Sequence, residues 1–265
     1  MPLPIDMERF RPSADTLGYV GAPSAAPLEH LQAGLGIWVN TSDDPVVLLR
    51  NGRRVAGPEP DFADGVVDTR TRADLVLSLG WRNRLVFGAT LPVTLWQEGF
   101  EPSAAGVGTG PIEPVPSGLG DVRFSAKGTV LPWREGRPVA LAAQATVSLP
   151  TGSVRSFLGD GVPTFGPELV VEASDRSVAK REHRIRAVAT LGARFKSADS
   201  FHGVSFGSGL TYGAAVGVHP FRPIEAGVEL SGAASGARLA QRPLELLPHL
   251  RIQPVDVASI SAQSR

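Results

Sequence analysis

The stretch Gly120-Asp-Val-Arg-Phe-Ser-Ala-Lys-Gly-Thr-Val130 alternates between two kinds of residue without a break. One face of an extended chain would carry Val122, Phe124, Ala126, Gly128 and Val130, and the other Asp121, Arg123, Ser125, Lys127 and Thr129. A period of two is typical of a β-strand with one apolar and one polar face. One such strand fits a soluble sheet as well as a membrane barrel, so the rest of the chain decides between them.

The same alternation recurs along most of the chain. It predicts further strands over residues 66–80, 84–95, 139–149, 165–173, 183–195, 204–218 and 224–230, with a first strand near 30–40 and a tenth near 243–252. Strands of soluble sheets commonly have about five or six residues. A strand that crosses a membrane at a tilt needs about 9–11. The lengths therefore favour an all-β, antiparallel, up-and-down transmembrane β-barrel.

The connections between these strands alternate in length. Short turns are expected at 81–83, 132–136 and 219–222, whereas the segments 41–65, 97–117 and 151–163 are long and rich in Gly, Pro, Asp and Ser. A barrel of the bacterial outer membrane has short periplasmic turns and long outer loops. The pattern thus predicts two unlike ends, with 174–182 longer than the rule requires.

The composition fits this interpretation and excludes others. The 265 residues include 30 Gly, 23 Pro and no Cys, as expected for many turns and no disulfides. With 26 basic and 26 acidic residues the net charge is zero, which argues against nucleic-acid binding. No apolar run is long enough for a membrane helix, and residues 1–10 lack the features of a secretory signal.

Three strings carry a family resemblance: Ser117-Gly-Leu-Gly-Asp-Val-Arg-Phe-Ser-Ala-Lys-Gly128, Ala142-Ala-Gln-Ala-Thr-Val-Ser-Leu-Pro-Thr-Gly152 and Phe157-Leu-Gly-Asp-Gly-Val-Pro-Thr-Phe-Gly166. They resemble the N-terminal barrel module of OmpA-like outer-membrane proteins of the myxobacterial type, over about residues 8–252. The resemblance implies a bacterial outer-membrane location and a barrel of twelve strands, followed by calcium-binding repeats and a peptidoglycan-binding domain. The tail after Ile252 departs from that continuation.

The expected organisation has three parts. Residues 1–28 form a periplasmic lead segment, 29–252 the β-barrel with about ten strands, and 253–265 an irregular tail. Pro248 would remove a ladder hydrogen bond from the tenth strand, which should therefore pair as a poor edge strand beside the ninth. We expect the sheet to curl without sealing against its first strand.

The polar faces predict a charged lumen. Its basic and acidic residues nearly balance, which indicates cross-strand ion pairs in a narrow interior rather than a charge-selective pore. The lumen-facing charged residues are expected to be Asp68, Arg70, Arg72, Asp74, Arg84, Asp121, Arg123, Lys127, Glu168, Glu172, Arg184, Arg186, Arg194, Glu225 and Glu229.

Aromatic residues lie near the strand ends. Trp81, Trp133 and Phe221 fall at short turns and Trp96 at the opposite end, as in an interfacial aromatic girdle. The five histidines show no metal-ligand spacing, and no serine is marked out as a nucleophile beside them. The sequence indicates no catalytic residue, metal site or cofactor.

The sequence therefore predicts a structural outer-membrane barrel that is not an enzyme. Its expected partners are outer-membrane lipid, lipopolysaccharide and the barrel-assembly machinery, and small solutes if the lumen conducts. Two alternatives stay open: a small-solute channel on the same scaffold, and a soluble all-β binding or adhesin domain. If the protein can be extracted only with detergent, it is one of the two membrane barrels and not the soluble domain.

Overall fold

The computed structural model describes residues 11–46, 49–50, 53–54, 66–99, 115–178, 184–197, 199–201, 204–221, 224–235 and 244–252. Nearly all regular structure in this part of the chain is β-strand, with one 3-10 turn, η2, at Val154–Ser156. The predicted tail 253–265 lies outside the described residues. The all-β class expected from the alternating pattern is confirmed.

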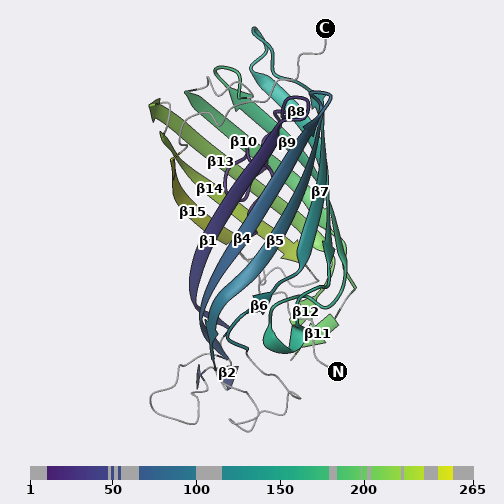
Figure 1. The fold of residues 1–265 in the computed structure, drawn as a ribbon, viewed down its shortest axis with the longest axis vertical. Coiled ribbons are helices and arrows are strands. Elements are labelled where there is room, and N and C mark those ends of the chain that lie inside the picture. The colour runs from purple at the N-terminus through teal and green to yellow at the C-terminus, as the bar shows by residue number, and fades with distance from the viewer. Residues whose placement is uncertain are drawn as a thin grey trace.

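Ten strands follow one another around a single antiparallel sheet (Figure 1). They are β1 (Ala33–Val46), β4 (Val67–Trp81), β5 (Leu85–Glu98), β7 (Val122–Leu131), β8 (Val139–Leu149), β9 (Thr164–Ser174), β10 (Ile185–Arg194), β13 (Gly209–Phe221), β14 (Ile224–Ser235) and β15 (Leu244–Ile252). Because neighbours in the sheet are neighbours in sequence, the topology is up-and-down.

Short accessory strands lie at the ends of the long ones. β6 (Gly118–Leu119) pairs with β5, β2 (Leu49–Arg50) pairs with β3 (Arg53–Arg54), and β11 (Asp199–Phe201) pairs with β12 (Val204–Phe206). The strand predicted over 204–218 therefore begins too early. Residues 204–206 belong to the β11–β12 hairpin, and the long strand β13 starts at Gly209.

The sheet curls into a half-barrel, so that β1, β4 and β5 lie in front of β10, β13 and β14 in Figure 1. Its convex face carries exposed apolar side chains, such as Leu35 and Ile37, which are 68% and 66% exposed. The concave face carries the buried charges, including Asp74 at 0% and Arg186 at 1%. This distribution is the reverse of a soluble sheet, whose apolar side chains pack inward.

The two edges of the sheet are β1 and β15. Among the described residues β1 pairs only with β4, and β15 pairs only with β14. Pro248 lies in β15 opposite Val228, at the edge of the sheet where a missing N–H donor is tolerated. The prediction of a tenth edge strand over about 243–252 is confirmed, and the curled sheet is not closed within the described residues.

The two ends of the half-barrel differ as the connection lengths predicted. The short-turn end includes Arg82 and Asn83, which both have positive φ, as in the tight turns of β-hairpins. At the long-loop end the connection from β8 to β9 folds back over the interior. Arg70 donates to the carbonyl of Phe157 (2.9 Å), and Asp121 accepts from the amide of Asp160 (2.7 Å).

Candidate functional site: the occupied interior

The interior of the half-barrel contains the N-terminal part of the chain itself. We call residues 11–28 the interior segment. Its side chains and main chain contact inward-facing groups on opposite walls of the half-barrel, from Ser78 of β4 to Glu229 of β14. Ser24, Ala25 and Leu28 are almost fully buried. The interior of the half-barrel is therefore occupied by polypeptide.

Glu229 of β14 binds the main chain of the interior segment. Its carboxylate accepts hydrogen bonds from the successive amides of Val20 (2.6 Å), Gly21 (2.9 Å) and Ala22 (3.0 Å). Consecutive N–H groups that converge on one carboxylate form an anion-binding concavity. Hydrogen bonds to an ionised acceptor are about twice as strong as neutral ones. Glu229 therefore fixes the middle of the segment.

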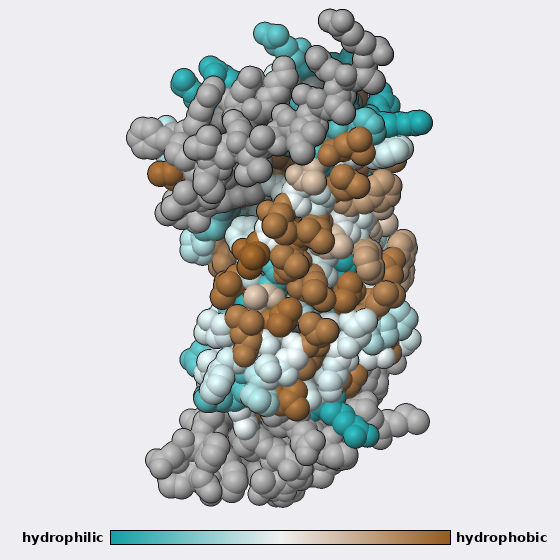
Figure 2. Space-filling view, viewed as in Figure 1, coloured by the Kyte–Doolittle hydropathy of each residue, from teal (hydrophilic) through white to brown (hydrophobic). Residues whose placement is uncertain are grey.

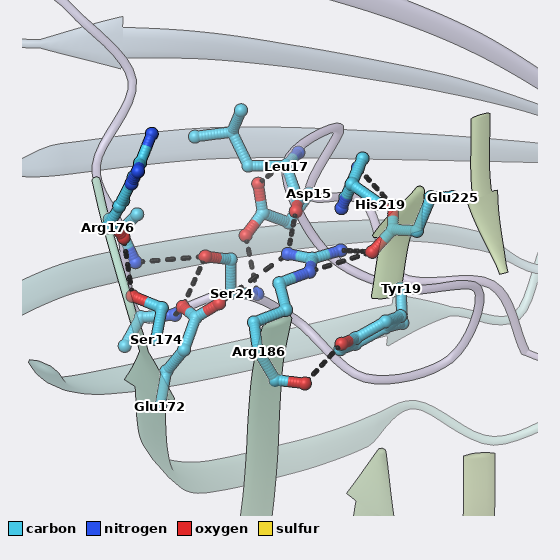
Figure 3. A network of polar contacts seen from close by, with 12 residues as sticks. Asp15, Leu17, Tyr19, Ser24, Glu172, Ser174, Arg176, Arg186, His219 and Glu225 are labelled. Carbon is cyan, nitrogen blue, oxygen red and sulfur yellow. Dashed lines mark hydrogen bonds and ion pairs between the residues drawn. The ribbon is translucent and has the colours of Figure 1, made fainter. Parts of the chain in front are cut away.

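Arg186 of β10 joins the segment to two further acidic residues (Figure 3). Its guanidinium lies 2.7 Å from Glu225 Oε1 and 3.5 Å from Glu172 Oε1, and it donates to the main-chain carbonyl of Leu17 (2.7 Å). All three charged side chains are about 1% exposed. A buried cation needs such partners, since removing it from water unpaired is costly.

Tyr19 packs directly against this cluster. The Arg186 guanidinium carbon lies 3.9 Å from the centre of the Tyr19 ring, and the phenol donates to the Arg186 carbonyl at 2.9 Å. Tyr19 also belongs to an apolar cluster made with the strands: Ala22, Ala25, Ala140, Ala142, Val170, Val188 and Ala215.

Glu172 and Lys127 hold the second half of the segment. Glu172 Oε2 accepts from the amide of Ala25 (2.7 Å) and from the Ser24 hydroxyl. Lys127 Nζ donates to the carbonyls of Ser24 (2.7 Å) and Ala26 (2.9 Å), and it forms an ion pair with Asp15. Here again the strands bind main-chain groups more than side chains.

The interior segment runs from one end of the half-barrel to the other. Arg11 pairs with Asp160 in the long-loop connection at 3.4 Å. Beyond the segment, the amide of Leu31 donates to the carbonyl of Gly80 (2.9 Å), beside the short turn between β4 and β5. Residues 11–28, which belong to the lead segment expected ahead of the barrel, thus enter from the long-loop end and pass through the interior.

The predicted lumen charges divide into three groups. Most are buried on the concave face: Arg70, Arg72, Asp74, Asp121, Arg123, Lys127, Glu172, Arg186, Glu225 and Glu229. Asp68, Glu168 and Arg194 are half-buried, and the last two line a cavity of about 210 Å³ on the long-loop side of the segment. Arg84 and Arg184 are exposed at the same end of the half-barrel and do not join the interior, because each directly precedes its strand.

The cross-strand ion pairs expected in the interior are partly present. Asp74 pairs with Arg72 on its own strand and with Arg123 of β7 at 3.4 Å. Arg70 instead bonds to Gln97 of β5, and Lys127 to Asp15 of the interior segment. Arg70 thus still joins β4 to β5, through an amide rather than a carboxylate partner, whereas Lys127 binds a residue that the strand pattern does not contain.

The predicted girdle aromatics occupy different environments. Trp81 and Trp96 are 40% and 53% exposed at opposite ends of β4 and β5, as a girdle requires. Trp133 instead packs against the interior apolar cluster and donates its indole N–H to the Ser174 carbonyl (3.2 Å), so it covers the short-turn end. The Phe221 side chain lies outside the described residues.

Two histidines also approach the interior carboxylates, which the spacing of histidines in the sequence did not indicate. His219 Nε2 lies 3.6 Å from Glu225 Oε2, and His249 Nδ1 lies 3.5 Å from Glu229 Oε1. The His249 ring meets Tyr19 edge-on at 5.3 Å between centroids. Among the described residues, no three potential ligands gather into a metal site.

Comparisons with known proteins do not assign the chain to a family. No protein-family model matches the chain, and no curated protein matches it significantly. Within the described part of the chain, no helix is long and apolar enough to cross a membrane.

Proposed function

We propose that the protein is a β-barrel of the bacterial outer membrane with a structural role in the cell envelope. The observation that supports this most is the inverted distribution of side chains. Large apolar residues cover the convex face, while the charged residues are buried inside. Figure 2 shows hydrophobic residues gathered in a band across the middle of the molecule, with hydrophilic ones toward both ends.

Exposed apolar side chains occur on every long strand around the sheet. Examples are Val39, Leu77, Phe87, Phe124, Leu141, Leu169, Leu191, Leu210, Val228 and Leu246. A soluble monomer rarely exposes apolar patches larger than a few hundred Å². A bilayer would cover such a surface, and strands of 10–15 residues, such as β7 and β4, are long enough to cross it. These features favour lipid contact over a soluble binding or adhesin domain.

The filled interior favours a structural role over solute passage. Charged groups of the strands, such as Lys127, Glu172 and Glu229, hold residues 11–28 in the interior. The outer membrane is proposed because single-chain barrels of this type belong there, and the resemblance to OmpA-like barrel modules agrees. Lipid, lipopolysaccharide and the barrel-assembly machinery are the partners that such a protein would meet.

Membrane fractionation tests this proposal. After expression in a Gram-negative host, the protein should remain in the membrane pellet in high salt and carbonate and leave it only in detergent. Its unheated form should migrate faster than its boiled form on a gel. A monodisperse protein in detergent-free buffer would overturn the proposal.

Conductance separates the structural role from the channel. We expect the purified protein in planar bilayers to show no steady conductance, because the interior segment occupies the lumen. Stable, uniform single-channel steps from the intact chain would favour the small-solute channel instead.

A further inference from the structure

We infer that the interior wall of the half-barrel is a binding site for a folded, turn-rich polypeptide main chain, and that residues 11–28 are its exchangeable occupant. This goes beyond the structural role proposed above and does not depend on lipid contact. The ligand class is a peptide in which small residues separate a few buried large side chains, namely Leu17, Tyr19 and Leu28.

The recognition is mainly of main-chain atoms. The donors of the wall reach carbonyls: Arg186 that of Leu17, Lys127 those of Ser24 and Ala26, and Thr129 that of Ala25 (2.9 Å). The acceptors of the wall reach amides: Glu229 those of Val20, Gly21 and Ala22, and Glu172 that of Ala25. Main-chain groups are common to all residues, so such a wall selects the path of the main chain, which includes the turn closed by the hydrogen bond from the Ser13 amide to the Val20 carbonyl (2.7 Å).

The wall lacks side chains where the occupant approaches it most closely. A Cβ atom added to Gly217 would lie 2.7 Å from the Tyr19 ring, and one added to Gly88 would lie 2.6 Å from Cβ of Ala14. Glycine permits this close approach of another chain. The two sites therefore define where the wall accepts an aromatic side chain and where it accepts a small one.

The occupant is packed closely against the wall but not on every side. A cavity of about 210 Å³ borders Ser13, Ala14, Gly21 and Pro23 on the long-loop side. At the other end, Glu29 and His30 are exposed where the segment joins β1. The segment is thus a ligand that is tethered at an accessible position, and cutting the tether makes it a separate peptide.

The test uses the full-length protein with a protease recognition sequence inserted after Glu29. The protein is folded first, cleaved, and mixed with a fluorescent synthetic peptide of residues 11–28, and exchange is followed by anisotropy. We expect the cleaved protein to take up the peptide and the uncleaved protein to exclude it. Retention of fold is checked by gel mobility of the unheated sample.

Two further arms test the main-chain recognition. A peptide N-methylated at Val20 and Ala22 loses two amide donors to Glu229, and we expect it to bind at least about tenfold more weakly. In the wall, Glu229→Gln should weaken binding of the unmodified peptide. Glu168→Gln, which faces the same interior beside the cavity, should leave binding unchanged.

The outcomes are decisive in either direction. Exchange with a tenfold effect of N-methylation supports the inference. A cleaved, folded protein that never takes up the peptide overturns it, as does equal binding of the methylated peptide. If cleavage unfolds the protein, hydrogen exchange is measured on the intact chain instead. The amides of Val20, Gly21 and Ala22 should then exchange faster than those of β8. Equal exchange rates would overturn the inference. The assay runs in buffer or detergent, so failure of the membrane proposal would be seen separately.

Discussion

Single residues on the concave face show how closely the interior segment is fitted to the sheet. Gly217 of β13 has no side chain where the Tyr19 ring lies, and Gly80 of β4 has none where Leu28 and Glu29 pass. In each case the space that an inward-facing side chain of the strand would occupy is taken by residues 11–29. The stability of the fold should therefore depend on these glycines more than on others.

Gly217→Ala tests this dependence. The new methyl group would lie 2.7 Å from Cε1 of Tyr19, so the ring must move, and such overpacking costs about 1–3 kcal/mol of unfolding free energy. Gly36→Ala is the matched control, because its methyl group would lie 3.8 Å from Cβ of Val76, an ordinary contact. Urea denaturation in detergent measures both. Equal midpoints for the two variants would contradict the fit described here.

Asp175 gives a prediction of pH dependence at the short-turn end. Desolvation opposes ionisation of its carboxylate, but hydrogen bonds from the amides of Arg184 (2.8 Å) and Ile185 (3.2 Å) outweigh it and lower its pKa. A lowered folded-state pKa means that the stabilisation is fully present above the unfolded-state pKa and is lost as the pH falls through the folded value. Wild type should therefore lose more stability than Asp175→Asn in acid, below about pH 4.

Denaturation midpoints of both proteins across pH 2–7 provide the measurement. The difference between them should be constant at neutral pH and shrink as the carboxylate becomes protonated. Parallel curves through the acid range would show that the turn does not depend on the charge of Asp175.

At the scale of elements, each strand has to satisfy two environments at once. β7 has exposed Phe124 and Ala126 on its convex face, and buried Arg123 and Lys127 on its concave face. The same period of two that predicted this strand from sequence thus separates a proposed lipid face from an interior that binds polypeptide. Substitutions at adjacent residues should distinguish the two faces.

Arginine placed on each face of β7 should have unequal effects. Ala126→Arg puts a charge on the proposed lipid face near mid-strand and should lower stability in a bilayer by about 2–4 kcal/mol. Ser125→Arg points into the interior beside the 210 Å³ cavity, where there is room for the side chain, and should cost much less. Refolding into lipid vesicles measures both variants. Equal tolerance would argue that the convex face does not meet lipid.

The elements also show what sequence could and could not provide. The strands were predictable because alternation of apolar and polar residues directly reflects the two faces of a sheet. The start of β13 was misplaced because Val204-Ser-Phe206 alternates as well, although it pairs with β11. The interior segment was not predictable in this way, since its contacts use main-chain groups that leave no pattern in the side chains.

A weaker signal for the segment does exist. Gly34, Gly80, Gly88 and Gly217 all fall on the polar faces of their strands and all approach the interior segment. Glycine weakens a strand unless another chain comes close. Glycines at inward-facing strand positions, together with an N-terminal segment rich in Ser, Ala, Gly and Pro, are therefore a sequence signal that the lumen is filled. The charges alone suggested only ion pairs between strands.

At the scale of the whole molecule, the open question is how the edges of the sheet are satisfied. β1 and β15 each have one hydrogen-bonded neighbour among the described residues, whereas the long strands between them have at least two. An unpaired main-chain group in the hydrocarbon of a bilayer costs several kcal/mol. The ten strands run alternately up and down, so the two edges are antiparallel and could in principle pair with each other. Pro248 in β15 would remove one donor from part of that pairing.

Hydrogen exchange provides the test of this architecture. In detergent micelles the amides of β1 that point away from β4 should exchange much faster than those of β8, which are bonded between β7 and β9. β15 should show the same contrast with β13. Protection of β1 equal to that of β8 would mean that its edge is paired after all. A cysteine pair placed across β1 and β15 would then form a disulfide within one chain if the half-barrel closes on itself, and a disulfide between two chains if a second copy supplies the missing neighbour.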